Sequence, residues 1–145
     1  MTAYANGEFT PTNPAKYVGK LPITYRSSWE ISMMRVLDLH PNVLQWASES
    51  ITIPYLHPIT GKWTFYIPDF LVVFVDKNGV KRAELIEIKP AKETFVDEAK
   101  SKKDKVVLAI NLAKWKAAQE WCHKNGVVFK VMTEHDLFRK PGSKK

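Results

Sequence analysis

The sequence predicts an α/β domain in which helices flank a mixed β-sheet, with the core elements in the order αβββαβ. The chain has 145 residues, of which 45% are hydrophobic, so it can form one domain with a substantial core. Two segments with apolar residues at helical spacing stand before and after a block of short, strand-like segments. A last strand-like segment follows the long second helix, which we expect to pack on the sheet.

The first helix is expected from Ser27 to about Leu39. Ser27 is a good N-cap residue, because its side chain can accept a hydrogen bond from a free backbone N–H. The apolar stripe of this helix is formed by Trp29, Met33, Val36 and Leu37. A strand is expected next, over 50–56, because apolar residues take every second position there.

Two turns divide the central block of strands, one at Thr60–Gly61 and one within Asp76–Gly79. The run just before the second turn is apolar on both faces, which is typical of a central, buried strand. Pro90 ends the block, because proline cannot donate a backbone hydrogen bond to a neighbouring strand. These strands are expected at 63–67, 70–75 and 81–89.

The second half of the chain begins with a charged connection, 91–104. A long helix should follow over 105–124, with Asn125–Gly126 as its stop signal. A strand over 127–132 and a short helix from Thr133 to about Phe138 complete the order. We therefore divide the chain into an extended N-terminal arm (1–24), a main domain (25–138) and a basic C-terminal tail (139–145).

Charge and cysteine content limit the classes of function. Lysine and arginine total 22 against 15 acidic residues, and the net charge of +7 favours a polyanionic partner, although many basic proteins have none. The single cysteine, Cys122, excludes a disulfide framework and a cysteine-based zinc site within one chain, and it favours a reducing compartment. No apolar run approaches the roughly 20 residues of a membrane span. The first residues lack the order of a secretory signal, so we expect a protein that is neither secreted nor in a membrane.

Glu87 and Lys89 end one predicted strand on the same face, and Asp69 begins the strand before it. The loop between the two strands decides how they meet. If the loop is 77–79 with Gly79 in the left-handed conformation, the register places Asp69 opposite Glu87. A two-residue loop would instead place Asp69 opposite Ile88 and scatter the group.

Clustered carboxylates repel one another unless a cation lies between them, and a hard, oxygen-ligated ion such as Mg²⁺ suits Asp69 and Glu87. Such an ion activates water and neutralises charge on a phosphodiester in the transition state. Lys89 could orient or deprotonate the water and contact the phosphate. The bland alternative is a polar strand start at Asp69 and a surface ion pair between Glu87 and Lys89, which the apolar surroundings disfavour.

These residues resemble a known superfamily. Pro68–Asp69 followed by Glu87-Ile88-Lys89 resembles the two-part signature of the PD-(D/E)XK nucleases, and 26–30 resembles their first-helix motif. The chain from about residue 14 to 137 is similar to the small head-completion nucleases of tailed bacteriophages and to the catalytic domains of transposon-end endonucleases. The segments that carry this similarity are Tyr25-Arg26-Ser27, Trp29-Glu30, Trp46-Ala47-Ser48-Glu49, Ile67-Pro68-Asp69-Phe70, Ile86-Glu87-Ile88-Lys89-Pro90 and Asn111-Leu112-Ala113-Lys114-Trp115.

The resemblance implies a restriction-endonuclease-like core and a Mg²⁺-dependent deoxyribonuclease, in which Mn²⁺ can substitute. It implies hydrolysis of DNA phosphodiester bonds to 5′-phosphate and 3′-hydroxyl ends, during phage head completion after DNA packaging. The partners would be DNA and phage head or portal proteins, in the host cytoplasm during assembly or in the virion. The implied catalytic residues are Glu30, Asp69, Glu87 and Lys89, and the implied metal ligands are Asp69, Glu87 and the Ile88 carbonyl, with Glu30 as a further ligand, direct or through water.

Two other functions stay open on the same fold. One is a structural head or neck protein that binds DNA ends with a degenerate nuclease site, although the intact Asp69, Glu87 and Lys89 argue against degeneracy. The other is a resolvase of branched DNA, which would act as a dimer.

Several further residues have two interpretations. Glu30 stands three residues after Ser27, so it can form a capping box instead of a metal contact. The remaining candidates are expected to contact DNA, and the alternative for each is an ordinary solvated surface. These DNA-binding candidates are Arg26, Lys100, Lys102, Lys103, Asn111 and Lys114.

Overall fold

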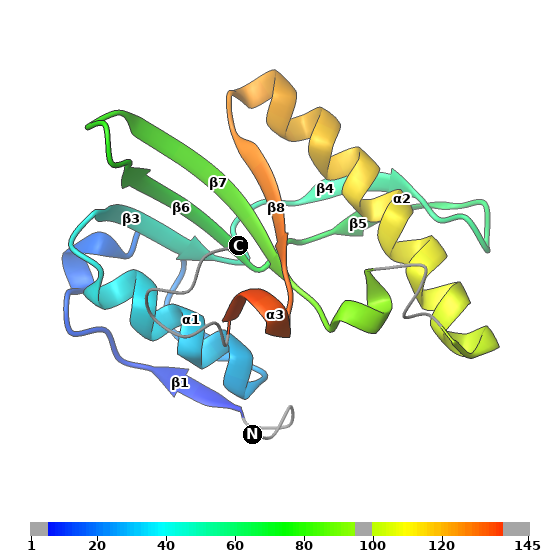
Figure 1. The fold of residues 1–145 in the computed structure, drawn as a ribbon, viewed down its shortest axis with the longest axis horizontal. Coiled ribbons are helices and arrows are strands. Elements are labelled where there is room, and N and C mark those ends of the chain that lie inside the picture. Colours follow the sequence, from blue (N-terminus) through cyan, green and yellow to red (C-terminus); the bar gives the residue numbers. More distant parts are fainter. Residues whose placement is uncertain (1–5, 95–99, 138–145) are drawn as a thin grey trace.

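A computed structural model describes residues 6–94 and 100–137. Its centre is a four-stranded mixed sheet in the order β3-β6-β7-β8 (Figure 1). β3 pairs antiparallel with β6, and β6 with β7, whereas β7 and β8 are parallel. The strands are β3 (Val43–Ser48), β6 (Phe70–Val75), β7 (Lys81–Ile88) and β8 (Val128–Met132).

Helices cover the two faces of this sheet. α1 (Ser28–Leu39) packs on the face that carries Phe70 and Ile86, and α2 (Lys102–Asn125) packs on the face that carries Leu85. Since side chains alternate along a strand, Glu87 lies on the α2 face with Leu85. The short helix α3 (Glu134–Leu137) follows β8.

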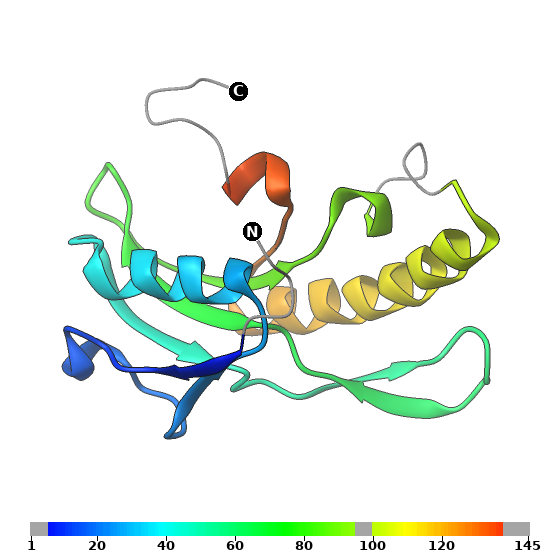
Figure 2. The same ribbon diagram turned by 90° about the horizontal axis from the view of Figure 1, so that it is seen from below.

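A separate hairpin of two strands, β4 (Ile53–Leu56) and β5 (Trp63–Tyr66), lies along α2 (Figure 2). Its inward side chains, among them Ile53, Tyr55 and Tyr66, join the core on that side. The hairpin leads directly to Pro68 and Asp69, so it ends where the inner strand β6 begins.

The predicted order αβββαβ is confirmed as α1, β3, β6, β7, α2 and β8, but with different strands. The strands predicted at 50–56 and 63–67 form the separate hairpin, and β3 was not predicted. β3 escapes the alternation pattern because its register shifts between Val43 and Gln45, which places two exposed residues in succession.

The long helix begins at Lys102, three residues before the predicted start at Lys105. Ser101 accepts a hydrogen bond from the Asp104 backbone, and the Asp104 side chain accepts one from the Ser101 backbone. This capping box starts the helix within the predicted connection. The helix ends as predicted, with Gly126 at φ 68°.

The predicted loop between β6 and β7 is confirmed. Asp76 and Val80 pair across a three-residue loop, and Gly79 has a φ of 77°. The observed register joins Phe70 to Ile86, so the next residues outward, Asp69 and Glu87, face each other.

The N-terminal segment is tied to the core in its described part. It forms β1 (Gly7–Phe9), a 3-10 turn η1 (Pro14–Lys16) and β2 (Ile23–Tyr25). The rings of Phe9 and Tyr17 lie 6.0 and 4.7 Å from the ring of Trp46. The predicted arm thus packs on the core, while the predicted tail, 139–145, lies outside the described residues.

Two expectations from composition can be checked. Cys122 is a free, buried thiol on α2, and burial raises its pKa to about 11. None of the described helices is long and apolar enough to span a bilayer.

Candidate nuclease site

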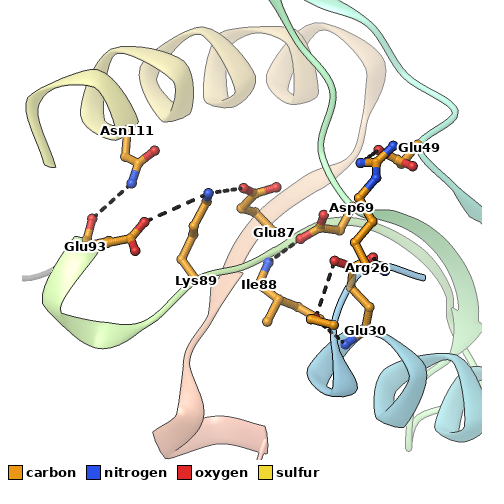
Figure 3. Close-up of polar contacts among 10 residues, drawn as sticks. Arg26, Glu30, Glu49, Asp69, Glu87, Ile88, Lys89, Glu93 and Asn111 are labelled. Atoms are coloured by element: carbon orange, nitrogen blue, oxygen red, sulfur yellow. Dashed lines mark hydrogen bonds and ion pairs between the residues drawn. The ribbon is translucent and has the colours of Figure 1, made fainter. Parts of the chain in front are cut away.

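The candidate site is a pocket of about 330 Å³ at the end of β7, between the start of α1 and the segment that follows β7. The structure brings together six of the predicted site residues there, and Figure 3 shows them with their polar contacts. The lining residues are Arg26, Ser27, Trp29, Glu30, Asp69, Glu87, Ile88, Lys89, Pro90 and Glu93.

Asp69 is held from both its backbone and its side chain. Its carbonyl oxygen accepts a hydrogen bond from the Glu49 N–H at 2.9 Å. Its Oδ2 accepts one from the Ile88 N–H at 2.7 Å, which points the carboxylate at the end of β7 (Figure 3). Pro68, which precedes it, is fully buried and fixes the approach of the chain.

Glu87 is the most buried carboxylate of the pocket, with 5% of its surface exposed. Its Oε2 lies 3.7 Å from Lys89 Nζ, whereas Oε1 has no hydrogen-bond partner among the described residues. Burial raises the pKa of Glu87. Burial and the adjacent Glu87 charge raise the pKa of Asp69 well above its usual range.

Lys89 follows β7 and is positioned by its neighbours. Its backbone N–H donates to the Met132 carbonyl at 3.0 Å, which extends the pairing with β8. Its Nζ lies 4.0 Å from Oε1 of Glu93, in the 3-10 turn η2 (Ala91–Glu93). The ammonium therefore stands between Glu87 and Glu93.

Glu30 forms one wall of the pocket from the first turn of α1. Its backbone N–H donates to Ser27 Oγ at 3.1 Å, so Ser27 caps the helix as predicted. Its Oε1 accepts from the N–H of Arg26 at 3.1 Å, one residue before the position that a capping box uses. Burial raises the pKa of Glu30. Arg26 forms an exposed ion pair with Glu49 at 2.8 Å.

Two of the α2 candidates, Asn111 and Lys114, lie beside the pocket. Asn111 is buried, and its Nδ2 donates to the Glu93 carbonyl at 3.3 Å, so it fastens η2 to α2. Lys114 Nζ lies 6.0 and 5.6 Å from the ring centres of Tyr55 and Tyr66. Burial, followed by the nearby Lys89 charge, lowers the pKa of Lys114, whereas Glu87 raises it.

Three lysine candidates do not line the pocket. Lys100 precedes the N-cap of α2, and Lys102 and Lys103 lie in the first turn of the helix. All three are exposed, which leaves them accessible to a phosphate backbone.

The sequence prediction missed three residues near the site: Glu49, Tyr66 and Glu93. Glu49 has a φ of 49°, which is rare outside glycine and marks a special backbone position. Glu93 stands four residues after Lys89, a spacing that would have indicated the pairing had a helical turn been expected there. Tyr66 takes an inward position on β5, and only the fold reveals its proximity to Glu87.

The donor set suits a hard cation held by few protein ligands. No three His, Cys, Asp or Glu side chains within the described ranges lie close enough to hold a metal ion. Asp69 and Glu87 nevertheless oppose each other, and the pKa of each is raised, so both carboxylates are insufficiently neutralised by the protein. Two opposed carboxylates with raised pKa values fit a divalent ion that keeps part of its water shell.

Comparison with known proteins agrees with this geometry. Residues 40–134 match the family model described as TnsA-like endonuclease N terminal. The chain is also 35% identical over 143 residues to the head completion nuclease of Enterobacteria phage T4, covering 91% of this chain and 93% of that protein. The matched span contains Asp69, Glu87 and Lys89 and more than half of the chain, and the chain therefore belongs to the TnsA-like endonuclease N-terminal family.

Proposed function

We propose that the chain is a metal-dependent DNA endonuclease of the PD-(D/E)XK type that acts in phage head completion, after DNA packaging. The observation that carries this proposal is the convergence of Asp69, Glu87 and Lys89 at one corner of the sheet, enforced by the β6–β7 register. The endonuclease family and the T4 relative support both the chemistry and the setting.

Asp69, Glu87 and the Ile88 carbonyl would hold the ion, Mg²⁺ in the cell with Mn²⁺ as a substitute. When bound, the ion supplies an activated water molecule and neutralises charge on the scissile phosphate. The hydrogen bond from Ile88 to Asp69 Oδ2 holds the Asp69 carboxylate at the end of β7 before the ion binds. The chain thus provides a preorganised ligand set.

Lys89 and Glu30 would act on the water and the phosphate from opposite walls. The Lys89 ammonium lies beside Glu87, where it can orient the attacking water or contact a phosphate oxygen. Because its oxygens already serve the start of α1, Glu30 would influence the ion through a water molecule.

DNA would be bound by basic groups around the pocket. Arg26 lines the pocket and Lys114 lies near enough for Glu87 to raise its pKa, while Lys100, Lys102 and Lys103 extend the basic surface along the start of α2. Asn111 would act on DNA only indirectly, by fixing η2 through Glu93. Phage head or portal proteins would be the protein partners, in the host cytoplasm during assembly or in the virion.

The test is cleavage by the purified full chain of linear, nicked and branched DNA, in Mg²⁺, in Mn²⁺ and in EDTA. We expect cleavage with either metal and none in EDTA, and a cleavage rate reduced about a hundredfold or more in Glu87→Gln. If wild type cuts none of the three DNA forms although it binds metal, the protein is a DNA-end-binding structural protein instead. Cleavage confined to branched DNA would make it a resolvase.

A further inference from the structure

Three buried polar atoms, one of Glu87 and two of neighbouring aromatic residues, lack a hydrogen-bond partner within the part of the chain that the structure describes. They are Glu87 Oε1, the hydroxyl of Tyr66 and Nε1 of Trp115. A buried polar atom without a partner costs free energy, and native proteins keep few of them. Three together beside a candidate metal site therefore need an explanation.

The three side chains belong to one neighbourhood. Tyr66 on β5 and Trp115 on α2 pack in the same cluster as Leu85, which shares a face of β7 with Glu87. Burial and the adjacent Glu87 carboxylate raise the pKa of the Tyr66 hydroxyl, and the Trp115 indole beside it opposes this rise. Tyr66 therefore stands next to both Glu87 and Trp115, although neither contact has good hydrogen-bond geometry.

The chemistry of the three groups allows one order of hydrogen bonds. An indole N–H can only donate, a carboxylate oxygen can only accept, and a tyrosine hydroxyl can do both. Trp115 must therefore donate to Tyr66, and Tyr66 must donate to Glu87. A single chain of two hydrogen bonds then satisfies all three atoms.

We propose that Trp115 Nε1–H, the Tyr66 hydroxyl and Glu87 Oε1 form a hydrogen-bond relay that closes when Glu87 binds the ion. The relay holds Oε1, so that Oε2, the oxygen beside Lys89, faces the ion. Tyr66 and Trp115 are thus positioning residues that act through Glu87. This inference rests on the proposed function, since it assumes that Glu87 is a metal ligand.

Lys114 supports the arrangement from outside the relay. Its ammonium lies over the ring of Tyr66, at 5.6 Å from the ring centre, which helps to hold the ring in place. Tyr55 provides a matched comparison, because Lys114 also lies over its ring, at 6.0 Å. Tyr55 is buried like Tyr66, but Glu87 does not affect its pKa and its hydroxyl is not among the unpaired atoms.

The experiment is calorimetric titration of the DNA-free full chain with Mn²⁺, for wild type, Tyr66→Phe and Tyr55→Phe. Hydrogen bonds that orient a metal ligand typically change metal affinity by roughly 10- to 100-fold. We expect Tyr66→Phe to weaken Mn²⁺ binding at least about tenfold and Tyr55→Phe to leave it unchanged. In EDTA, the melting temperature of Tyr66→Phe should equal or exceed that of wild type, because the lost hydroxyl has no partner there.

A second pair of variants tests the order of the relay. Trp115→Phe should weaken Mn²⁺ binding less than Tyr66→Phe, and it should add nothing in the Tyr66→Phe background, because the relay is already broken. Wild-type affinity in Tyr66→Phe, together with lost affinity in Glu87→Gln, would overturn the relay and leave the metal site standing. Wild-type affinity in Glu87→Gln, or no Mn²⁺ binding by wild type, would overturn the proposed metal site itself.

Discussion

Two carboxylates, Asp38 at the end of α1 and Glu87 at the end of β7, are both buried, but their hydrogen bonds differ. Asp38 is 2% exposed and accepts from the N–H groups of Thr12 at 2.7 Å and Asn13 at 2.8 Å. The Asn13 side chain donates in turn to the Asp38 carbonyl. Glu87 is 5% exposed, and its Oε1 has no partner in the described residues.

Under the proposed function, this difference separates a structural carboxylate from a metal ligand. The carboxylate oxygens of Asp38 accept hydrogen bonds from the N-terminal segment, which ties that segment to α1. Glu87 lines a pocket beside a second carboxylate and an ammonium, and its Oε1 lacks the donors that Asp38 has. Burial alone therefore does not mark a functional acid, whereas burial with unsatisfied acceptors does.

The largest expected effect is the loss of cleavage when the charge of Asp69 or Glu87 is removed. Glu87→Gln and Asp69→Asn should each reduce the cleavage rate by about a hundredfold or more, the scale for removing one preorganised electrostatic group. Lys89→Ala should do the same. For Glu87→Gln and Asp69→Asn, circular dichroism and a melting curve in EDTA should show an intact fold, because each change removes one of two repelling charges. Unfolded variants would mean that the two acids are as structural as Asp38.

Asp38→Ala should give the opposite result. It leaves two backbone N–H groups without their acceptor, which costs roughly 1–3 kcal/mol for each unsatisfied group. We expect a lower melting temperature and a cleavage rate near wild type when measured well below that temperature. A variant that keeps its stability but loses cleavage would erase the distinction between Asp38 and Glu87.

Glu30 lies between these two classes, since its carboxylate accepts from the Arg26 N–H just before α1 and also lines the pocket. Glutamine can replace it as a cap but supplies no negative charge to an ion. Glu30→Gln should keep its stability and lose most of the cleavage, whereas Glu30→Ala should also lose about 1 kcal/mol of stability. Melting curves and cleavage rates over a Mg²⁺ titration measure both. Full activity in Glu30→Gln would assign Glu30 to helix capping alone.

The pH dependence of stability gives a smaller signal. Because the pKa of Asp69 is raised in the folded protein, the folded state holds this proton more tightly than the unfolded chain, whose pKa is about 3.9. In EDTA, stability should therefore fall as the pH rises from about 4 through the raised pKa. Asp69→Asn should flatten this fall in melting temperatures measured across the range. Parallel curves for the two proteins would contradict the raised pKa.

The smallest effect is expected from the exposed lysines at the start of α2. Removing the charges of Lys100, Lys102 and Lys103 together should weaken DNA binding and flatten its dependence on salt, because fewer condensed counterions are released. Binding isotherms at several salt concentrations measure the slope, with Lys116 and Lys124, exposed further along α2, as matched control positions. An unchanged slope would show that the first three lysines only solvate the helix.

The sequence predicted that Asp69 and Glu87 face each other, because local rules determine the strand register. A three-residue loop with Gly79 sets the β6–β7 register, and that register brings Asp69 to Glu87. The family resemblance predicted the same residues independently. Ser27 as the cap of α1 and Gly126 as the end of α2 were also correct, since caps depend on a few neighbouring residues.

Features that depend on distant contacts could not be predicted. β3 lies at the edge of the sheet with an irregular register, so its sequence lacks a clear period. Asp38 resembles any polar residue near a helix end until Thr12 and Asn13 reach it from the N-terminal segment. In the sequence, Tyr66 is an ordinary aromatic residue of a strand. Its position beside Glu87 depends on how the β4–β5 hairpin packs, which the sequence pattern does not show.

The central claim is that Asp69 and Glu87 hold one divalent ion at the end of β7. The most direct test is anomalous diffraction from crystals of the full chain grown with Mn²⁺. We predict one strong peak within bonding distance of carboxylate oxygens of Asp69 and Glu87 and of the Ile88 carbonyl, and no such peak in Glu87→Gln crystals. A Mn²⁺ peak elsewhere, with the pocket between Asp69 and Glu87 free of metal, would contradict it.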